Sequence, residues 1–339
     1  MSRTKKLIAL SVALSIFATI AVLYFTFSEE TLEALKEMKV EFLFLSLLIH
    51  IAALFVWSLR IKVLSRTLGF HVELRRAIEI VTSSIFMAAI TPSHAGGEPV
   101  RVALLTRCGL SPGDSSAVVL GERVLDGIFL SFLAVFSLFY LQKHLQSHTH
   151  LRVVAIVSLL LIIGSIGFLI LSVANPRAPE RAKRISKKLM DRFEWLRKRE
   201  VIVERILEEI LNFRNAMIVL MRRKNHGTVF ALALTAIFWS LEFSIPSIII
   251  LGVGEPGDFL LSYFIQAVLT IILMLPLTPG SSGVAEIGSA TFYSILLPPY
   301  KLGIFVVVWR FVTYHFNLIL GSLMALKVLR SLKKWGKSS

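Results

Sequence analysis

The chain has 339 residues, of which 55% are hydrophobic and 17% charged, and its mean hydropathy is +0.74. This composition is too apolar for a soluble globular domain and indicates an integral membrane protein. The net charge of +15 lies mainly between the apolar runs, so we interpret it as a membrane-topology signal rather than as a nucleic-acid surface. A single cysteine, Cys108, excludes an intramolecular disulfide and any site built from several thiolates.

The first apolar run, residues 7–27, follows a short basic segment at residues 1–6. It contains 21 uncharged residues, which is longer than the core of a secretory signal, and no small-residue cleavage site follows it. We therefore interpret this run as a signal anchor that stays in the protein.

Five further runs meet or approach the roughly 20 residues that a helix needs to cross a bilayer. They are residues 42–59, 118–141, 153–174, 228–251 and 303–326. Two other segments, 77–117 and 259–298, are apolar but are interrupted by Pro and Gly turns. The sequence thus predicts an all-α polytopic membrane protein, one transmembrane domain over residues 1–339, with about six full transmembrane helices and two broken or re-entrant helical hairpins.

The charges between the apolar runs predict which side of the cell membrane each segment faces. Basic segments at residues 1–6, 60–76, 175–226 and 330–337 should be cytoplasmic, as are both termini, whereas the acidic segment 28–41 should be outside. The longest of them, 175–226, carries 15 Lys or Arg against 7 Asp or Glu. The number of crossings then requires hairpin 77–117 to enter from the cytoplasmic face and hairpin 259–298 from the opposite face.

The two hairpins resemble each other in sequence. Thr, Pro and Gly of TPSHAGGE at residues 91–98 recur in TPGSSGVAE at residues 278–286, at an offset of 187, and Arg123 and Arg310 keep that offset. Upstream, Trp57-Ser58-Leu59 recurs as Trp239-Ser240-Leu241. We predict an inverted repeat of residues 42–141 and 228–326, joined by a linking helix at 153–174 and a cytoplasmic basic loop at 175–226.

Inverted repeats of transporters hold their substrate near the bilayer midplane, where broken helices direct their dipole ends at polar groups. Exposed backbone at that depth is tolerated where it lines a water-filled cavity. We therefore expect a polar cavity between the hairpin tips, which contain Thr91, Pro92, Gly96, Gly97, Thr278, Pro279 and Gly283.

Ionisable residues at membrane depth are costly, and function is the default hypothesis for them. The candidate substrate-binding residues are Glu98, Arg101, Glu122, Arg123, Asp126, Glu286 and Arg310. Arg123 and Arg310 are the preferred ligands, because a guanidinium presents a fixed fork of donors that suits a phosphate. Free amides in the glycine turns would add to such a site, although these turns can equally serve only to break the helices.

Several candidates have a structural interpretation of equal or greater weight. Glu122 and Asp126 can pair internally and simply hold helices together. His50 and His315 stand alone in apolar helices and are interpreted as hydrogen-bonded core residues, and no metal site or cofactor is predicted. Residues 175–226 are typical of an amphipathic helix on anionic lipid, and equally of a solvated loop.

Three stretches together resemble the flippase-like transmembrane domain of lysylphosphatidylglycerol synthases. They are TPSHAGGEPVR at residues 91–101, GERVLDG at 121–127 and LPLTPGSSGVAEIG at 275–288, and the resemblance extends from residue 7 to 330. It implies a module that moves a lipid between leaflets, without the synthase activity, because the soluble aminoacyl-transferase domain is missing. Relatives fused to glycosyltransferases imply polyprenyl-linked sugars as another cargo. Ser281 and Ser282 replace a richer glycine run, which weakens the case for a close approach of backbone to substrate.

The predicted function is a flippase or transporter, and not an enzyme, for an anionic phospholipid or a polyprenyl-linked lipid bearing phosphate. Its energy could come from a gradient, with Glu98 and Glu286 as proton carriers. One alternative is a membrane-embedded enzyme acting on a lipid phosphate, with one of these carboxylates as general base. Another is a scaffold that presents residues 175–226 to a cytoplasmic lipid-modifying enzyme. The symmetric placement of the motifs favours transport, because catalysis would gather its residues on one face.

Overall fold

The computed structural model describes residues 3–91, 96–144, 226–274, 278 and 280–335, with four single positions between residues 145 and 225. All elements assigned in these ranges are helical, so the chain is an all-α polytopic membrane protein. The predicted linking helix 153–174 and the basic loop 175–226 fall almost entirely outside the described residues.

The N-terminal segment forms two helices, α1 (Arg3–Thr26) and α2 (Glu29–Glu37). Helix α2 occupies part of a segment that we expected to be a loop, and it turns by 112° from α1. The backbone amide of Ser28 donates to Thr31 Oγ1 at 3.0 Å, and Glu29 and Glu30 lie in the first turn, where carboxylates favour a helix start.

The first repeat contains α3 (Val40–Thr67), α4 (Leu74–Ala89), α5 (Gly97–Arg107) and α6 (Pro112–His144). Helix α3 continues past its predicted end at residue 59, because Ile61 and Leu64 prolong its buried apolar face. Arg60, which we had assigned to a cytoplasmic loop, therefore lies inside the helix. The start of α6 at Pro112 likewise takes residues 112–117 out of the first hairpin.

The second repeat contains α11 (His226–Gly252), α12 (Phe259–Leu273), α13 (Val284–Tyr293) and α14 (Pro299–Arg310). A π-helical turn, η1 (Phe311–His315), then joins α14 to α15 (Phe316–Trp335). Helix α12 begins where Asp258 Oδ1 accepts from the Leu261 amide at 3.0 Å. The sequence predicted a straight helix over 303–326 and gave no sign of the π turn.

Within the described residues, three helical segments are long and apolar enough to cross a membrane: Val40–Thr67, His226–Gly252 and Pro299–Lys327. The bent pair of α1 and α2 raises this number to as many as four. Our expectation of about six spans stays a prediction, because residues 153–174 lie outside the described part of the chain.

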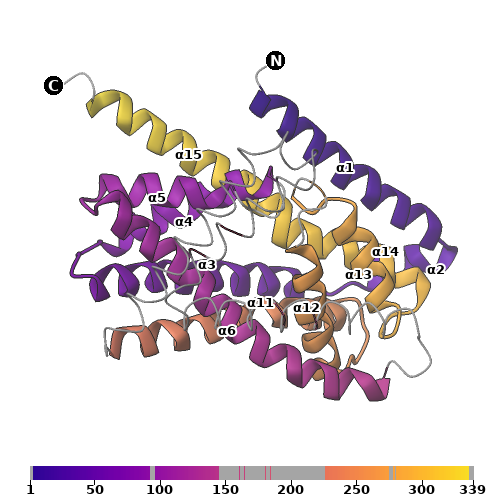
Figure 1. Cartoon of the computed structure of the whole chain (residues 1–339). Coiled ribbons are helices and arrows are strands. Elements are labelled where there is room, and N and C mark those ends of the chain that lie inside the picture. The colour runs from indigo at the N-terminus through magenta and orange to yellow at the C-terminus, as the bar shows by residue number, and fades with distance from the viewer. Residues whose placement is uncertain are drawn as a thin grey trace.

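The corresponding helices of the two repeats, α3 and α11, run antiparallel along each other (Figure 1). The Lys39 amide donates to the Gly252 carbonyl at 2.9 Å at one end of the pair, and Gly227 lies against Thr67 at the other. We call the end with Lys39 and Gly252 the α2 end of the molecule, and the end with Thr67 and Gly227 the α5 end. The first hairpin starts from the α5 end and the second from the α2 end, in agreement with an inverted repeat.

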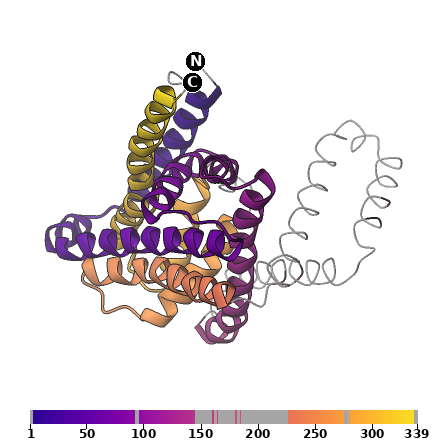
Figure 2. The same ribbon diagram turned by 90° about the vertical axis from the view of Figure 1, so that its left-hand side faces the viewer.

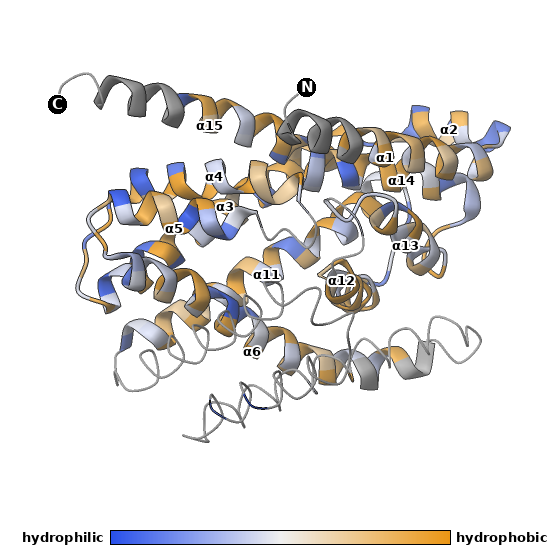
Figure 3. Ribbon diagram, turned by 45° about the horizontal axis from the view of Figure 1, so that its top comes forward, coloured by the Kyte–Doolittle hydropathy of each residue, from blue (hydrophilic) through white to orange (hydrophobic). Residues whose placement is uncertain are grey.

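Charged residues differ between the two ends. The α2 end carries the glutamates of α2, whereas Arg66, Arg75, Arg76 and Arg107 lie at the α5 end, and Figure 3 shows hydrophilic residues on α2 and at the ends of α4 and α5. Gly303 lies against Leu23 and Thr26 at the α2 end, so α1 begins at the opposite end. In Figures 1 and 2 the start of α1 and the end of α15 both lie along the upper side of the molecule, and Figure 1 shows them well apart along it.

Each repeat has its own apolar core. One cluster joins α3, α4, α5 and α6 around Leu64, Val81 and Leu105, and the other joins α11, α12, α13 and α14 around Ile265 and Phe305. Helix α15 packs closely on α4, where Gly321 leaves no room for a side chain beside Phe86 and Thr82. The two cores leave the polar centre of the molecule between them.

Candidate functional site

The tips of the two hairpins meet at the centre of the molecule. The Gly280 amide of the second tip donates to the Thr91 carbonyl of the first tip at 3.2 Å. Gly280, Ser281 and Gly283 all have positive φ angles, of 58°, 53° and 86°. This left-handed stretch reverses the chain between α12 and α13 without leaving the core. Pro92 and Pro279 lie outside the described residues.

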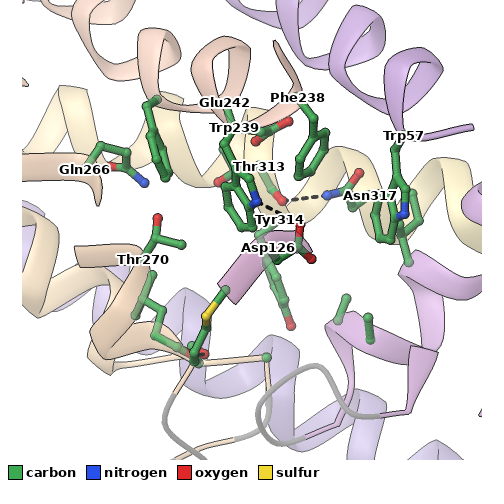
Figure 4. A pocket seen from close by; sticks show the side chains of 18 of the residues that line it. Trp57, Asp126, Phe238, Trp239, Glu242, Gln266, Thr270, Thr313, Tyr314 and Asn317 are labelled. Atoms are coloured by element: carbon green, nitrogen blue, oxygen red, sulfur yellow. Dashed lines mark hydrogen bonds between the residues drawn. The ribbon is translucent and has the colours of Figure 1, made fainter. Parts of the chain in front are cut away.

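A cavity of about 240 Å³ lies beside the joined tips (Figure 4). Its wall comes from both repeats and combines aliphatic and aromatic side chains with polar and charged ones. The charged and amide side chains that line it are Arg60, Arg101, Glu122, Arg123, Asp126, Glu242, Gln266, Arg310 and Asn317. Five of the seven predicted ionisable residues line the cavity, namely Arg101, Glu122, Arg123, Asp126 and Arg310. The other two, Glu98 and Glu286, form ion pairs with Arg123 and Arg310.

The same ion pair occurs once in each repeat. Arg123 Nε lies 2.6 Å from Glu98 Oε1, and Arg310 Nε lies 2.8 Å from Glu286 Oε1. In both repeats the glutamate stands in the first turn of the returning hairpin helix, and the arginine comes from the next helix, α6 or α14. The two halves therefore present an arginine to one cavity in equivalent ways.

The two pairs differ in how far they are enclosed. The side chains of Arg123 and Glu98 are 32% and 29% exposed, whereas those of Arg310 and Glu286 are 5% and 0% exposed. Ser15 of α1 closes the second pair, since its hydroxyl donates to Glu286 Oε1 at 2.6 Å and accepts from Arg310 Nη2 at 3.3 Å. The first pair is thus the more accessible to an incoming anion.

Arg60 is a site residue that sequence reasoning missed. The residue is 1% exposed, and its guanidinium lies 2.6 Å from Asp126 Oδ1 and 3.2 Å from Glu122 Oε1. Glu122 and Asp126 thus pair with Arg60 of α3, not with Arg123, which is three positions from Asp126 in sequence. The signal was present in the apolar positions Ile61 and Leu64, which continue the helix beyond Arg60.

Arg101 has the weakest pairing of the buried arginines that line the cavity. Its Nε lies 3.3 Å from Glu122 Oε2 without hydrogen-bond geometry, and its Nη1 donates to Ser84 Oγ at 3.5 Å. Glu122 already accepts from Arg60 and from Trp57 Nε1, at 2.6 Å for the latter. The Nε of Arg101 is therefore a donor without a hydrogen-bond acceptor at the wall of the cavity, and its guanidinium lies 5.1 Å from the centre of the Trp57 ring.

The two tryptophans of the repeated Trp-Ser-Leu motif have matching contacts. Trp57 Nε1 donates to Glu122, and Trp239 Nε1 donates to Asp126 Oδ1 at 2.9 Å (Figure 4). Sequence analysis used these residues only to detect the repeat. The structure places both at the cavity, each holding a carboxylate of α6.

Two of the glycine amides that we considered as anion donors, those of Gly96 and Gly283, are bound within their own hairpins. The Gly96 amide donates to Thr91 Oγ1 at 2.9 Å, and the Gly283 amide donates to Glu286 Oε2 at 2.7 Å. Side chains of the hairpins themselves have satisfied these two donors, because an unpaired amide at this depth is costly. Arginine side chains, not these amides, are the donors available to a ligand.

The π turn η1 lies directly after Arg310. Its residues Thr313 and Tyr314 line the cavity, and the Tyr314 ring lies 4.1 Å from the Arg310 guanidinium carbon. Single π turns inside α-helices occur frequently at functional sites. Here the turn directs Arg310, Thr313 and Tyr314 toward the same cavity.

The family model for the lysylphosphatidylglycerol synthase TM region matches residues 8–321. A UPF0104 membrane protein of Archaeoglobus fulgidus is 32% identical over 314 residues, which cover 93% of this chain and 94% of that protein. A UPF0104 membrane protein of Methanothermobacter thermautotrophicus is 24% identical, over 84% of this chain and 85% of that protein. One of Methanocaldococcus jannaschii is 22% identical, over 96% of each chain.

Proposed function

The chain belongs to the lysylphosphatidylglycerol synthase transmembrane family, and on this premise we propose that it is a lipid flippase. Its cargo would be an anionic phospholipid or a polyprenyl-linked lipid whose headgroup bears a phosphate. The headgroup passes through the cavity between the hairpin tips, while the hydrocarbon chains stay in the bilayer.

The observation that carries this proposal is the pair of equivalent arginines at one polar cavity. Arg123 and Arg310 come from oppositely oriented repeats, so a headgroup can be received in related ways from either side of the tips. A cavity of about 240 Å³ matches a small headgroup, since pockets for larger ligands measure roughly 300–1,000 Å³.

The same contacts make the enzyme alternative less favourable. Glu98 and Glu286 each form an ion pair with an arginine at the cavity, at 2.6 Å and 2.8 Å. Neither carboxylate is among the side chains that line the cavity, where a general base would have to contact a lipid phosphate.

We place the α5 end, with both termini, at the cytoplasmic face of the cell membrane. The support for this orientation is the arginine-rich character of that end and the glutamates of α2 at the other. With this orientation the first hairpin enters from the cytoplasm and the second from outside.

Transport can be tested with the protein in liposomes that contain fluorescent short-chain phosphatidylglycerol or polyprenyl phosphate. Variants should neutralise both partners of a pair, because removal of one partner leaves a buried unpaired charge. We expect Arg123→Ala with Glu98→Gln, and Arg310→Ala with Glu286→Gln, to slow lipid movement at least tenfold. A matched control is Lys301→Ala with Glu255→Gln, an ion pair of 2.8 Å outside the cavity.

Mass spectrometry of co-purifying lipids identifies the cargo without a prior guess. One anionic lipid should be enriched with the wild type and the control variant and lost from both cavity variants. If the wild type moves neither probe faster than protein-free liposomes, the flippase proposal is wrong. If the cavity variants move lipid as fast as the wild type, the arginines do not bind the headgroup.

A further inference from the structure

A second polar cluster, formed by His50, Glu242 and Asn317, lies in the wall of the same cavity. His50 of α3 is 3% exposed, Glu242 comes from α11, and Asn317 comes from α15. His50 stands ten residues after the start of α3, about 15 Å along the helix, which is close to the middle of a bilayer core of roughly 30 Å. We call these residues the His50 triad.

The hydrogen bonds of the two His50 ring nitrogens determine how many protons the His50 triad holds. His50 Nδ1 lies 2.8 Å from Glu242 Oε1, and His50 Nε2 lies 2.9 Å from Asn317 Oδ1. Asn317 Nδ2 donates to the Thr313 carbonyl at 2.7 Å, so the amide oxygen must face the histidine (Figure 4). Both imidazole nitrogens therefore face an acceptor.

A neutral imidazole carries one N–H and can satisfy only one of these acceptors when Glu242 is ionised. Both contacts form together if one more proton is shared between His50 and Glu242. That proton gives an imidazolium beside a carboxylate, or a neutral imidazole beside a carboxylic acid. Both descriptions contain the same number of protons, so this geometry is that of the proton-loaded triad.

The surroundings leave Glu242 as the charged partner of His50. Among the described residues of the helices that pack against α3, α15 presents Asn317 and the Phe316 ring, 6.1 Å from the imidazole. The carboxylates that α6 brings to α3 are bound to Arg60, and His315 of η1 is hydrogen-bonded to the Arg310 carbonyl. No arginine or lysine contacts the imidazole among the described residues.

The triad is connected to the cavity in two ways. Glu242 and Asn317 both line it, and the side chain of Glu242 is 17% exposed, so a proton can exchange with water in the cavity. Asn317 also binds Thr313 of the π turn that follows Arg310. Loss of the proton removes one of the two hydrogen bonds of His50. Through Asn317, which binds the Thr313 carbonyl, this loss can alter the π turn that follows Arg310.

We propose that the His50 triad is a proton-binding site whose occupancy is coupled to an anionic headgroup in the cavity. The inference rests on the proposed function for the identity of the second ligand, whereas the proton site itself does not. An anion in the cavity favours the protonated triad, because the added proton raises its charge by one. Linkage then requires that proton uptake also favours the anion.

The proton site can be observed without transport. Nitrogen-15 spectra of labelled histidines and infrared spectra of carboxyl groups are recorded on the whole chain in nanodiscs from pH 5 to 9. We expect either a His50 signal with both nitrogens protonated or a protonated carboxyl band. His50→Gln and Glu242→Gln should abolish it, whereas His315→Gln, which alters a histidine bound to its own helix, should leave it.

Added dihexanoyl phosphatidylglycerol should move the loss of this proton to higher pH by about one unit, equivalent to roughly tenfold coupling. A singly protonated His50 beside an ionised Glu242 at every pH would overturn the proton site. A titration that the lipid does not shift would overturn the coupling. Either spectrum is informative even if the wild type moves no lipid.

Transport under an imposed pH gradient separates this inference from the flippase proposal. We expect the gradient to accelerate lipid movement by the wild type and by His315→Gln, and His50→Gln to move lipid equally fast with and without it. A wild type that flips lipid without any response to the gradient would overturn the coupling and leave the flippase function intact.

Discussion

At the scale of single residues, Arg60 balances most of the buried negative charge at one wall of the cavity. It is bound by Glu122 and Asp126, and a third contact of 3.1 Å runs from its Nη1 to Thr235 Oγ1. These partners come from α6 and α11, so one guanidinium joins three helices. It holds both carboxylates at the wall of the cavity, where Glu122 Oε2 also lies 3.3 Å from Arg101 Nε.

Replacement of Arg60 by leucine should destabilise the folded protein strongly. The change leaves Asp126 without a buried counter-charge and Glu122 with Arg101 alone, at a cost of about 3–5 kcal/mol. A thiol-reactive dye can report thermal unfolding in detergent, because Cys108 is the only cysteine and is partly buried. Arg66→Leu, an exposed arginine of the same helix, serves as control and should shift the transition little.

A further variant tests the cause of this effect. Addition of Asp126→Asn to Arg60→Leu removes the unpaired charge, while Glu122 stays beside Arg101, and should recover part of the lost transition temperature. If Arg60→Leu unfolds at the same temperature as Arg66→Leu, the buried network has no role in stability.

At the scale of elements, the second hairpin depends on a turn that only some residues can adopt. Gly283 has φ of 86° and ψ of −54°, and its amide binds Glu286 of α13. A side chain there would meet no atom within 4 Å, so any cost of adding one is backbone strain and not a clash. The turn also sets the position of Gly280 against Thr91 in the other hairpin.

Gly283→Ala should therefore destabilise the protein by about 1–3 kcal/mol, the range for a residue in a sparsely populated backbone region. Gly127→Ala is the matched control, since Gly127 lies inside α6 with equally open space and a helical backbone. It should be neutral or stabilising by about 0.5–1 kcal/mol. Equal transition temperatures for the two variants would show that the turn bears no strain.

At the scale of the whole molecule, the antiparallel arrangement of the repeats predicts which ends face the same solution. In a Cys108→Ser background, Glu33→Cys lies exposed on α2 and Arg107→Cys lies exposed at the end of α5. An impermeant maleimide should label the first in intact cells and the second only after permeabilisation. Labelling of both in intact cells would contradict the inverted arrangement, and the reverse pattern would contradict the cytoplasmic placement of the α5 end.

Two features could be read from the sequence alone because they depend on local pattern. Long apolar runs predict helices that cross a bilayer, since each satisfies its own backbone hydrogen bonds, and Pro and Gly mark where those helices break. The repeated Glu and Arg positions also identified the residues that the structure joins as two equivalent ion pairs.

Tertiary structure alone decided which charges meet. Arg60 and Glu122 are 62 positions apart in the sequence and His50 and Glu242 are 192 apart, and nothing local to either member specifies its partner. The pairing follows from antiparallel packing of α3 on α11 and from the contact of α6 with both. In a bilayer, a helix forms independently of its neighbours, whereas a buried charge is stable only beside a partner that another helix brings to the same depth.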